Sequence, residues 1–271
     1  MSALCLTVSE RPAQRVDLSP LTPDGIAGKA VKEIAAIELA TGNRRIRVDS
    51  LFQISGEPGL EIEIRGSVEP LDRIGGGMTQ GRILVSGEAG AYLGIGMTGG
   101  SIEVAGGTGA FAASGMTGGV IRIAGNAGDF LAAALPGDHQ GMKGGTVLVA
   151  GNAGDRVGDR MRRGTVLIDG NTGDYCASRM VAGTIGVWGK VGRFPAAAMR
   201  RGTLLLRQAP DALSPTFSDC GVHPFSFLPL LARSWRNHPG KFATLPDSGL
   251  RLRRWMGDLA NGGRGEILIR A

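Results

Sequence analysis

Short segments in which apolar and polar residues alternate recur along the middle of the chain at nearly constant spacing. Each segment carries two apolar residues, most of them β-branched, separated by one residue, so that both side chains point to the same face of a strand. The seven pairs are Ile83/Val85, Ile102/Val104, Ile121/Ile123, Val147/Val149, Val166/Ile168, Ile185/Val187 and Leu204/Leu206. The pattern predicts one short strand per segment.

Methionine and glycine mark the same repeat. Seven methionines recur every 19 residues, with one interval of 26, and each is followed three residues later by a glycine. They are Met78, Met97, Met116, Met142, Met161, Met180 and Met199. A unit of 19 residues is too short for a helical-hairpin repeat or a propeller blade. We therefore expect an all-β chain, a right-handed parallel β-helix (solenoid) of about seven 19-residue glycine-rich turns with capping N- and C-terminal segments.

Stacking of equivalent units leads to further expectations. The methionines would form a buried internal column, and Asn126, Asn152 and Asn171 would hydrogen-bond to one another through their amides. The long interval contains an insert, residues 131–141, which we expect to project as a loop with Asp138 and His139 at its tip.

The repeat is absent from both ends of the chain, which predicts three regions. Residues 1–53 would form an N-terminal arm or cap, 54–207 the repeats, and 208–271 a C-terminal cap and subunit-contact segment. Ala27–Leu39 suits either one short helix or a helix followed by a strand. Pro224–Arg236 is apolar and aromatic, and we expect it to cover an end of the stack, because open ends expose strand edges.

Composition narrows the class of protein. The 271 residues include 46 glycines, and the apolar content of 42% indicates a globular chain. Aromatics make up 5%, which disfavours nucleic-acid binding through stacked bases despite a net charge of +6. Three widely spaced cysteines form no disulfide or cluster motif, and no signal peptide or apolar span is evident. These features predict a cytoplasmic protein without a membrane contact.

Catalytic and metal-binding motifs are not evident, because His139, His223 and His238 are isolated from one another and from other ligand types. The notable polar pattern is basic. Lys143, Arg162, Arg163, Arg200 and Arg201 all follow a repeat methionine by one or two positions, and we call these five residues the basic edge. Such a row favours an acidic partner or ligand. A solvated edge interleaved with acids, such as Asp155, Asp159 and Asp174, explains the same residues.

The motifs resemble a known family. The Met-x-x-Gly and Gly-x-x-Gly units are similar to the GXGXG repeat of the glutamate synthase C-terminal domain and of the C subunit of formylmethanofuran dehydrogenase. The flanking segments GNRRIRVDSLFQISG, GVHPFSFLPLLARSW and WMGDLANGGRGEILI resemble the C subunit of the bacterial formyltransferase/hydrolase complex.

This resemblance implies a role in one-carbon (formaldehyde) oxidation. The complex moves a formyl group from formyl-tetrahydromethanopterin to a methanofuran-like carrier and hydrolyses it to formate. The resemblance places the chemistry in partner subunits, a formyltransferase and an amidohydrolase-like hydrolase, and none in this chain. A methanofuran-type carrier has a glutamate-containing tail, which the basic edge would attract.

The same residues bear on other classes of protein. A β-helix polysaccharide-active enzyme needs sugar-stacking aromatics, and the tyrosines and tryptophans of the repeats are few: Tyr92, Tyr175 and Trp188. A hexapeptide-repeat acyltransferase needs a period of six rather than 19. A free glutamate-synthase-type scaffold protein stays open as an alternative.

Overall fold

The computed structural model describes residues 3–66, 70–246 and 249–270. The N-terminal part contains β1 (Leu4–Val8), β2 (Val16–Asp17), α1 (Val31–Ala35), β3 (Glu38–Thr41), β4 (Arg44–Arg47), α2 (Val48–Leu51), β5 (Phe52–Ser55), β6 (Glu61–Arg65) and β7 (Leu71–Asp72). The middle contains β8 (Arg82–Val85), β9 (Ser101–Val104), β10 (Val120–Ile123), β11 (Lys143–Val149), β12 (Arg163–Ile168), β13 (Thr184–Val187) and β14 (Thr203–Leu206). The C-terminal part contains β15 (Ser218–Pro224), α3 (Leu228–Trp235), the 3₁₀ helix η1 (Lys241–Thr244), β16 (Arg251–Gly257), the 3₁₀ helix η2 (Leu259–Asn261) and β17 (Gly265–Arg270).

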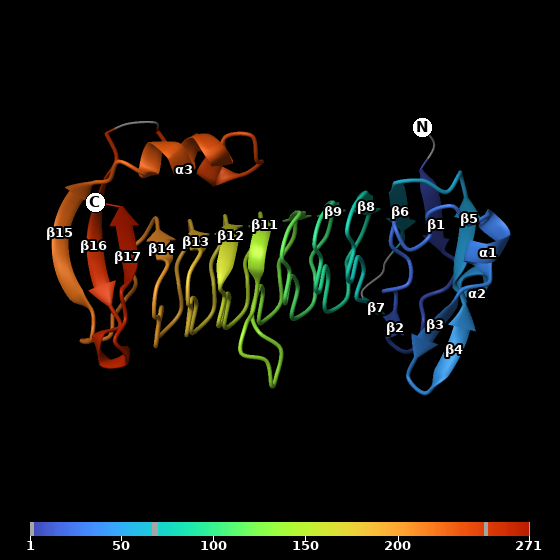
Figure 1. Cartoon of the computed structure of the whole chain (residues 1–271), viewed down its shortest axis with the longest axis horizontal. Helices are drawn as coiled ribbons and strands as arrows, with labels where there is room; N and C mark the ends of the chain where they lie inside the picture. Colours follow the sequence, from blue (N-terminus) through green and yellow to red (C-terminus); the bar gives the residue numbers. More distant parts are fainter. Residues whose placement is uncertain (1–2, 67–69, 247–248, 271) are drawn as a thin grey trace.

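Most strands belong to one long sheet. Its 13 strands run in the order β15-β16-β17-β14-β13-β12-β11-β10-β9-β8-β6-β1-β5, as Figure 1 shows along the molecule. A second sheet of four strands, β4-β3-β2-β7, lies at the N-terminal end. The pairings from β17 to β1 are parallel, whereas β15–β16, β16–β17 and β1–β5 are antiparallel.

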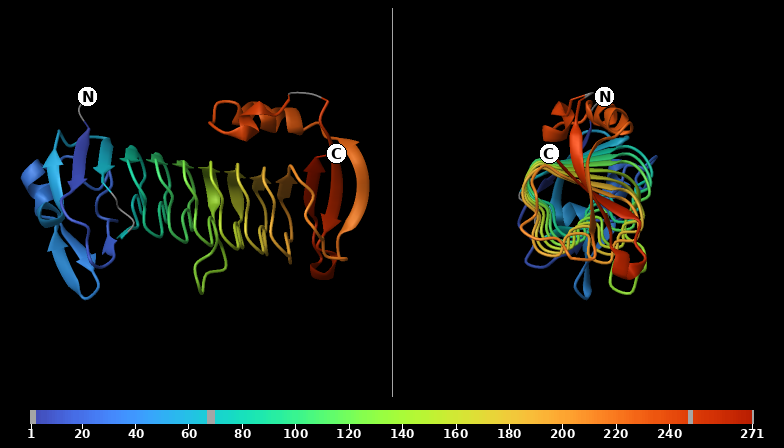
Figure 2. Two further views of the ribbon diagram at one scale, coloured as in Figure 1. Left: turned by 180° about the vertical axis from the view of Figure 1, so that it is seen from behind. Right: turned by 90° about the vertical axis from the view of Figure 1, so that its left-hand side faces the viewer.

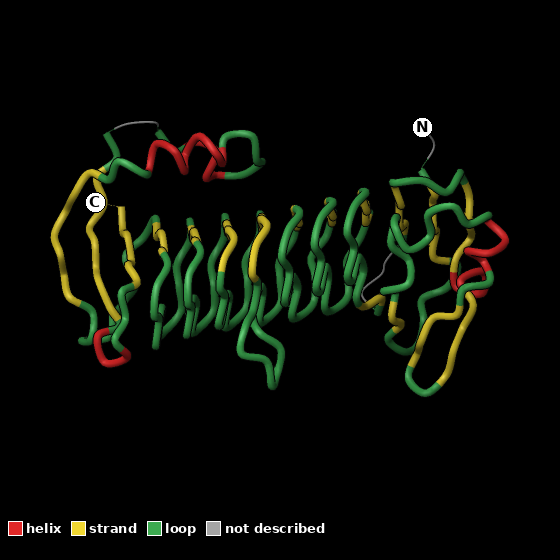
Figure 3. The backbone as a smooth tube through the Cα atoms, in the orientation of Figure 1, coloured by secondary structure: helices red, strands yellow, loops and turns green. Residues whose placement is uncertain are grey.

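The expected right-handed parallel β-helix of about seven 19-residue turns is therefore corrected. The main body is a large mixed sheet with few helices, in which each repeat unit contributes one named strand and the rest of the unit is turn or loop (Figure 3). The apolar pairs specify only that one strand per unit. The flank strands next to the repeats, β6 and β17, pair in parallel. Chain reversals within the flanks make the outer pairs antiparallel, and the repeat carries no information about those reversals.

The registers between repeat units agree with the sequence spacing. Ile83 pairs with Ile102, Ile102 with Ile121, and Ile121 with Val147 across the 26-residue interval. The end-on view of Figure 2 shows successive units lying behind one another. The seven repeat methionines are all 0% exposed, so their prediction as a buried column is confirmed.

Close approach of the units explains the glycine after each methionine. Gly100 has a φ of +80°, and a Cβ there would lie 2.6 Å from the carbonyl oxygen of Gly81 in the preceding unit. A residue with a side chain is disfavoured at Gly100 for two reasons: its φ is positive, and the preceding unit leaves no space for a Cβ.

The three asparagines form a ladder in which the side-chain oxygens accept mainly backbone N–H groups, rather than side-chain amides as predicted. The side-chain oxygen of Asn126 accepts the backbone N–H of Asn152 at 2.8 Å, and that of Asn152 accepts the N–H of Asn171 at 2.8 Å. A longer amide–amide contact of 3.4 Å joins Asn126 and Asn152. The side chains thus satisfy backbone donors at a turn, where no neighbouring strand supplies an acceptor.

The flanks differ in how they end the stack. Of the two alternatives for Ala27–Leu39, the structure has the helix followed by a strand. The sequence predicts that Pro224–Arg236 covers an end of the stack, and this prediction is wrong. Its helix α3 runs along the outward face of the sheet (Figures 1 and 2). Strands β15 to β17 extend that end instead. The division into 1–53, 54–207 and 208–271 stays a prediction.

Candidate functional site

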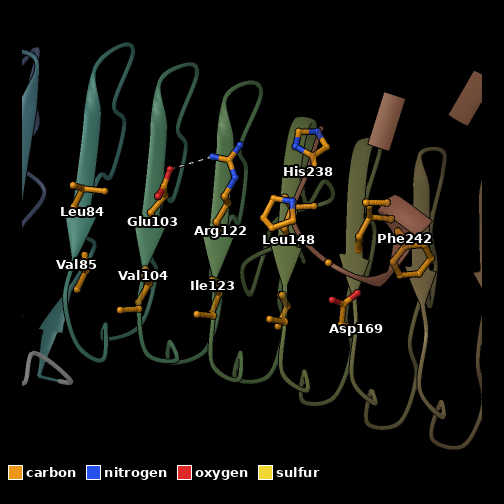
Figure 4. A pocket seen from close by; sticks show the side chains of 18 of the residues that line it. Leu84, Val85, Glu103, Val104, Arg122, Ile123, Leu148, Asp169, His238 and Phe242 are labelled. Atoms are coloured by element: carbon orange, nitrogen blue, oxygen red, sulfur yellow. Dashed lines mark hydrogen bonds and ion pairs between the residues drawn. The ribbon is translucent and has the colours of Figure 1, made fainter. Parts of the chain in front are cut away.

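A cavity of about 430 Å³ lies between the outward face of the sheet and the covering segment, which we define as residues 228–244. Strands β8 to β12 supply its floor, and the end of α3 with η1 supplies its roof. Figure 4 shows Leu84, Glu103, Arg122 and Leu148 on consecutive strands of the floor. The volume is in the range typical of ligand pockets, about 300–1,000 Å³. We call this cavity the outer groove.

The repeat shapes the floor of the outer groove. The position directly after each strand is occupied by small residues in four consecutive units: Ser86, Ala105, Ala124 and Ala150. The equivalent residue of the next unit is Asp169, whose N–H donates to Val149, and the one after it is Trp188, whose N–H donates to Ile168. Along this row the four small side chains leave the groove open, and the larger side chains of Asp169 and Trp188 close it at the C-terminal end.

Aromatic packing closes that end. Phe242 of the covering segment contacts the rings of Trp188 and Trp235 edge-on, at centroid distances of 5.5 and 5.7 Å. A Cβ at Gly186 would lie 2.7 Å from the Phe242 ring, so the glycine at this outward strand position makes room for the phenylalanine. The covering segment is thus held over one half of the sheet.

Charged side chains line the open half. One carboxylate oxygen of Glu103 accepts from Arg122 at 3.3 Å, and the other accepts from Arg82 at 3.2 Å (Figure 4 draws the first). Glu63 lies farther along the floor and is paired with Arg65 at 2.7 Å. Exposed ion pairs are weak because water screens the charges, so these pairs are available for exchange with a ligand.

Two titratable groups lie near the closed half. Burial raises the pKa of Asp169, against a backbone hydrogen bond from Lys241 at 2.9 Å. Burial and the nearby charge of Arg122 lower the pKa of His238, whose buried Nδ1 has no hydrogen-bond partner among the described residues. At neutral pH the imidazole is therefore uncharged.

This set of groups suits binding. Apolar walls combine with carboxylates at both ends, which favours a partner that carries apolar surface and hydrogen-bond donors or cations. Over the ranges 3–66, 70–246 and 249–270, no group of three or more His, Cys, Asp or Glu residues is placed to hold a metal ion. The expectation of a site without metal or catalytic residues stays a prediction.

Sequence reasoning did not find the outer groove, because its roof comes from a flank that has no repeat. A usable signal was present. The outward strand positions change from Leu84, Glu103 and Arg122 to Leu148 and Leu167 along the stack. That change marks where the sheet face is covered.

The basic edge lies elsewhere, at the corner where the strands begin, and all five of its residues are exposed. Lys143 pairs in register with Arg163, and the N–H of Arg162 donates to the carbonyl of Met142, which places these three on adjacent units. None of the five has a carboxylate within 4 Å in the described part of the chain. Whether they bind anything stays a prediction.

The edge is interrupted and then extended. Val181 and Ala182 occupy its positions in the unit between Arg162 and Arg200. Beyond Arg201, the exposed Arg264 joins it, since its N–H donates to the carbonyl of Arg200 at 2.6 Å. Sequence reasoning missed Arg264 because it lies far outside the 19-residue period. The signal was the segment RGEILI, which repeats the Arg-Gly-x-apolar-x-apolar pattern of RGTLLL.

Arginines that precede the methionines have structural partners. Arg179 donates through Nε to Asp159 at 2.8 Å, and this 3% exposed aspartate also accepts from Ser178 at 2.7 Å. Arg160 donates to the carbonyl of Asp138 at 3.0 Å and contacts Nδ1 of His139 at 3.1 Å. The insert therefore projects as a loop between β10 and β11, as predicted, and Arg160 holds its exposed tip (Figure 1).

Among the described residues, no helix is long and apolar enough to cross a membrane.

Comparison with known proteins identifies relatives. No family model matches the chain. The C subunit of the tungsten-containing formylmethanofuran dehydrogenase 2 of Methanothermobacter thermautotrophicus is 37% identical over 99 residues, which are 35% of this chain and 37% of that protein. The C subunit of the formyltransferase/hydrolase complex of Methylorubrum extorquens is 40% identical over 80 residues, 30% of each chain. These matches cover about a third of the relatives' length.

The structural match covers nearly the whole chain. A chain of the crystal structure of the formyltransferase/hydrolase complex from Methylorubrum extorquens, in complex with methylofuran, superimposes with a TM-score of 0.93 and 39% identity. The superposition covers 98% of this chain and 99% of that one. This chain belongs to the family of C subunits of formylmethanofuran dehydrogenases and formyltransferase/hydrolase complexes.

Proposed function

We propose that this chain is the non-catalytic C subunit of a formyltransferase/hydrolase complex in tetrahydromethanopterin-linked one-carbon oxidation. The complex would convert formyl-tetrahydromethanopterin to formate through a methanofuran-like carrier. The observation that carries the proposal is the match over 98% of the chain, at 39% identity, to a chain of such a complex. A cytoplasmic location is part of the proposal.

The partners follow from the same proposal. A formyltransferase and an amidohydrolase-like hydrolase would supply the chemistry, and this chain would hold them in place. Affinity purification of the tagged chain from its native host should recover both partners, together with formate release from formyl-tetrahydromethanopterin. A chain that purifies alone, in a host whose activity survives its deletion, would contradict the proposal.

The same purification separates the alternative functions. A free glutamate-synthase-type scaffold would bring down chains of that enzyme, and a polysaccharide-active enzyme would act without partners on a sugar polymer. A relationship to the glutamate synthase C-terminal domain, suggested by the GXGXG glycines, remains a hypothesis for structural superposition with that domain.

The basic edge is proposed to retain the acidic tail of the carrier. Its charges are exposed, have no acidic partner within 4 Å in the described residues, and are continued by Arg264. Each exposed pair with a glutamate would contribute about 0–1 kcal/mol, so several must act together. An acidic patch on a neighbouring subunit would satisfy the same residues.

The test replaces Arg162, Arg163, Arg200 and Arg201 with alanine and measures carrier content of the purified complex by mass spectrometry. We expect the content to fall, and to fall further as salt is raised, because screening weakens exposed charge pairs. Replacing Arg44, Arg45 and Arg47, on the distant strand β4, serves as the control and should leave it unchanged. Unchanged content in the first variant refutes this part of the proposal.

A further inference from the structure

The floor of the outer groove has a length that suits an extended chain. From Ser86 to Asp169 it passes five successive units, and a spacing of roughly 4.8 Å between strands makes this about 19 Å. An extended peptide of five or six residues covers that distance at about 3.3–3.6 Å per residue. A single row of small side chains on the floor fits a linear occupant better than a compact one.

Asp169 is the acid of the outer groove that lacks an ion-pair partner. The carboxylates of Glu63, Glu103 and Asp169 line the groove. Glu63 is paired with Arg65, and Glu103 is paired with Arg82 and Arg122. In the described part of the chain, no side-chain cation lies within 4 Å of the Asp169 carboxylate. Asp169, at the closed end, accepts two bonds from the backbone N–H of Lys241, whose ammonium donates to the Asp169 carbonyl instead. The carboxylate therefore has capacity for a cation from outside.

Apolar surface lies beside these acids. Leu84 on the floor is half-buried, and Ala105 and Ala124 are exposed. The covering segment lies over the strands near the C-terminal end of the sheet and leaves β8 and β9 uncovered (Figure 1), and the lining continues on that side to Glu63 on β6. An occupant can therefore enter from the neighbouring surface of the assembly.

We propose that the outer groove receives an extended segment of another subunit, which places an apolar side chain over Leu84 and Ala124 and a lysine or arginine at Asp169. The proposal rests on the proposed function, since it requires a multi-subunit complex. The Asp169 carboxylate selects a segment that carries a lysine or arginine, and the floor of about 19 Å selects an extended one. The covering segment would lie over the end of the bound segment that carries the lysine or arginine.

The experiment uses the complex purified through a tag on this chain, in a Cys220→Ser background that removes the exposed native thiol. Ala124→Cys places a thiol in the groove, and Ala212→Cys places a matched thiol at another exposed alanine. We expect N-ethylmaleimide to modify the thiol at position 124 at least tenfold more slowly than the one at 212. Equal rates would overturn the proposal.

Photo-crosslinking identifies the occupant. A benzophenone amino acid at position 84 should crosslink to a lysine- or arginine-containing peptide of another subunit, and Asp169→Lys should reduce the yield severalfold. Protection of position 124 without a crosslinked peptide would mean a small molecule and would also overturn the proposal. Failure of partners to co-purify with the unmodified chain would instead refute the proposed function.

Discussion

The two halves of the sheet's outward face use the same strand position for opposite chemistry. Leu148, Leu167 and Leu205 are 6%, 4% and 5% exposed under the covering segment, where they form an apolar cluster with its residues. In the uncovered half, Glu103 and Arg122 occupy equivalent positions and pair with each other at 3.3 Å. The covering segment buries the outward leucines that lie beneath it, whereas the uncovered half carries charged residues and the half-buried Leu84 at the same position.

The largest effect should come from a matched leucine pair. Leu167→Ala should lower the free energy of unfolding by about 2–5 kcal/mol, because a buried leucine leaves a cavity. Leu84→Ala, at the equivalent position of the uncovered half, should cost under about 1 kcal/mol. Urea unfolding measures both, and equal losses would break the distinction between the halves.

Overpacking tests the same cluster from the other direction. Gly186→Val should cost about 1–3 kcal/mol, since a Cβ there would lie 2.7 Å from the Phe242 ring and displace the covering segment. Hydrogen exchange of residues 228–244 should accelerate in this variant. The double variant Gly186→Val/Phe242→Ala should lose less free energy of unfolding than the sum of the two single variants. A loss equal to that sum would show that the Phe242 ring does not obstruct the valine.

A smaller effect is expected in the uncovered half. Arg122→Ala should change stability by about 0–1 kcal/mol, because its pair with Glu103 is solvent-accessible. A double-mutant cycle with Glu103→Ala isolates the pair. A coupling well above that range would mean that the uncovered half is as strongly ordered as the covered one.

The smallest effect concerns pH. Burial and Arg122 lower the pKa of His238 below its usual 6.5, so the unfolded chain binds the proton more readily than the folded one. Stability of the covering segment should therefore fall as pH drops below about 6.5. Asp169, with a raised pKa, acts in the opposite direction at lower pH. His238→Gln should remove the loss in hydrogen exchange between pH 7 and 5, and an unchanged profile would exclude this histidine.

Much of the middle of the molecule could be predicted because its residues repeat. Register between units, burial of Met116 and its equivalents, and the ladder from Asn126 follow from a 19-residue period, since stacking places equivalent side chains together. The uniform parallel solenoid was the wrong extrapolation. Residues such as Trp255 on β16 pair antiparallel, and no periodicity announces a chain reversal.

The candidate sites divide in the same way. Lys143, Arg162 and Arg163 could be placed on adjacent units from their spacing. Arg264 could not, because β17 returns to pair with β14 only after 58 residues that lack the repeat. The outer groove also needed the flank, since His238 and Phe242 reach it from outside the repeat.

The strands of the repeats, their register and the buried methionine column can all be predicted from the amino-acid sequence, because each depends on residues that recur at short, regular intervals and pack against their own equivalents. The mixed ends of the sheet, the position of Arg264 beside the basic edge and the outer groove become visible in the three-dimensional structure. Those features join segments far apart along the chain, and burial of apolar side chains against a distant partner has no preferred sequence separation.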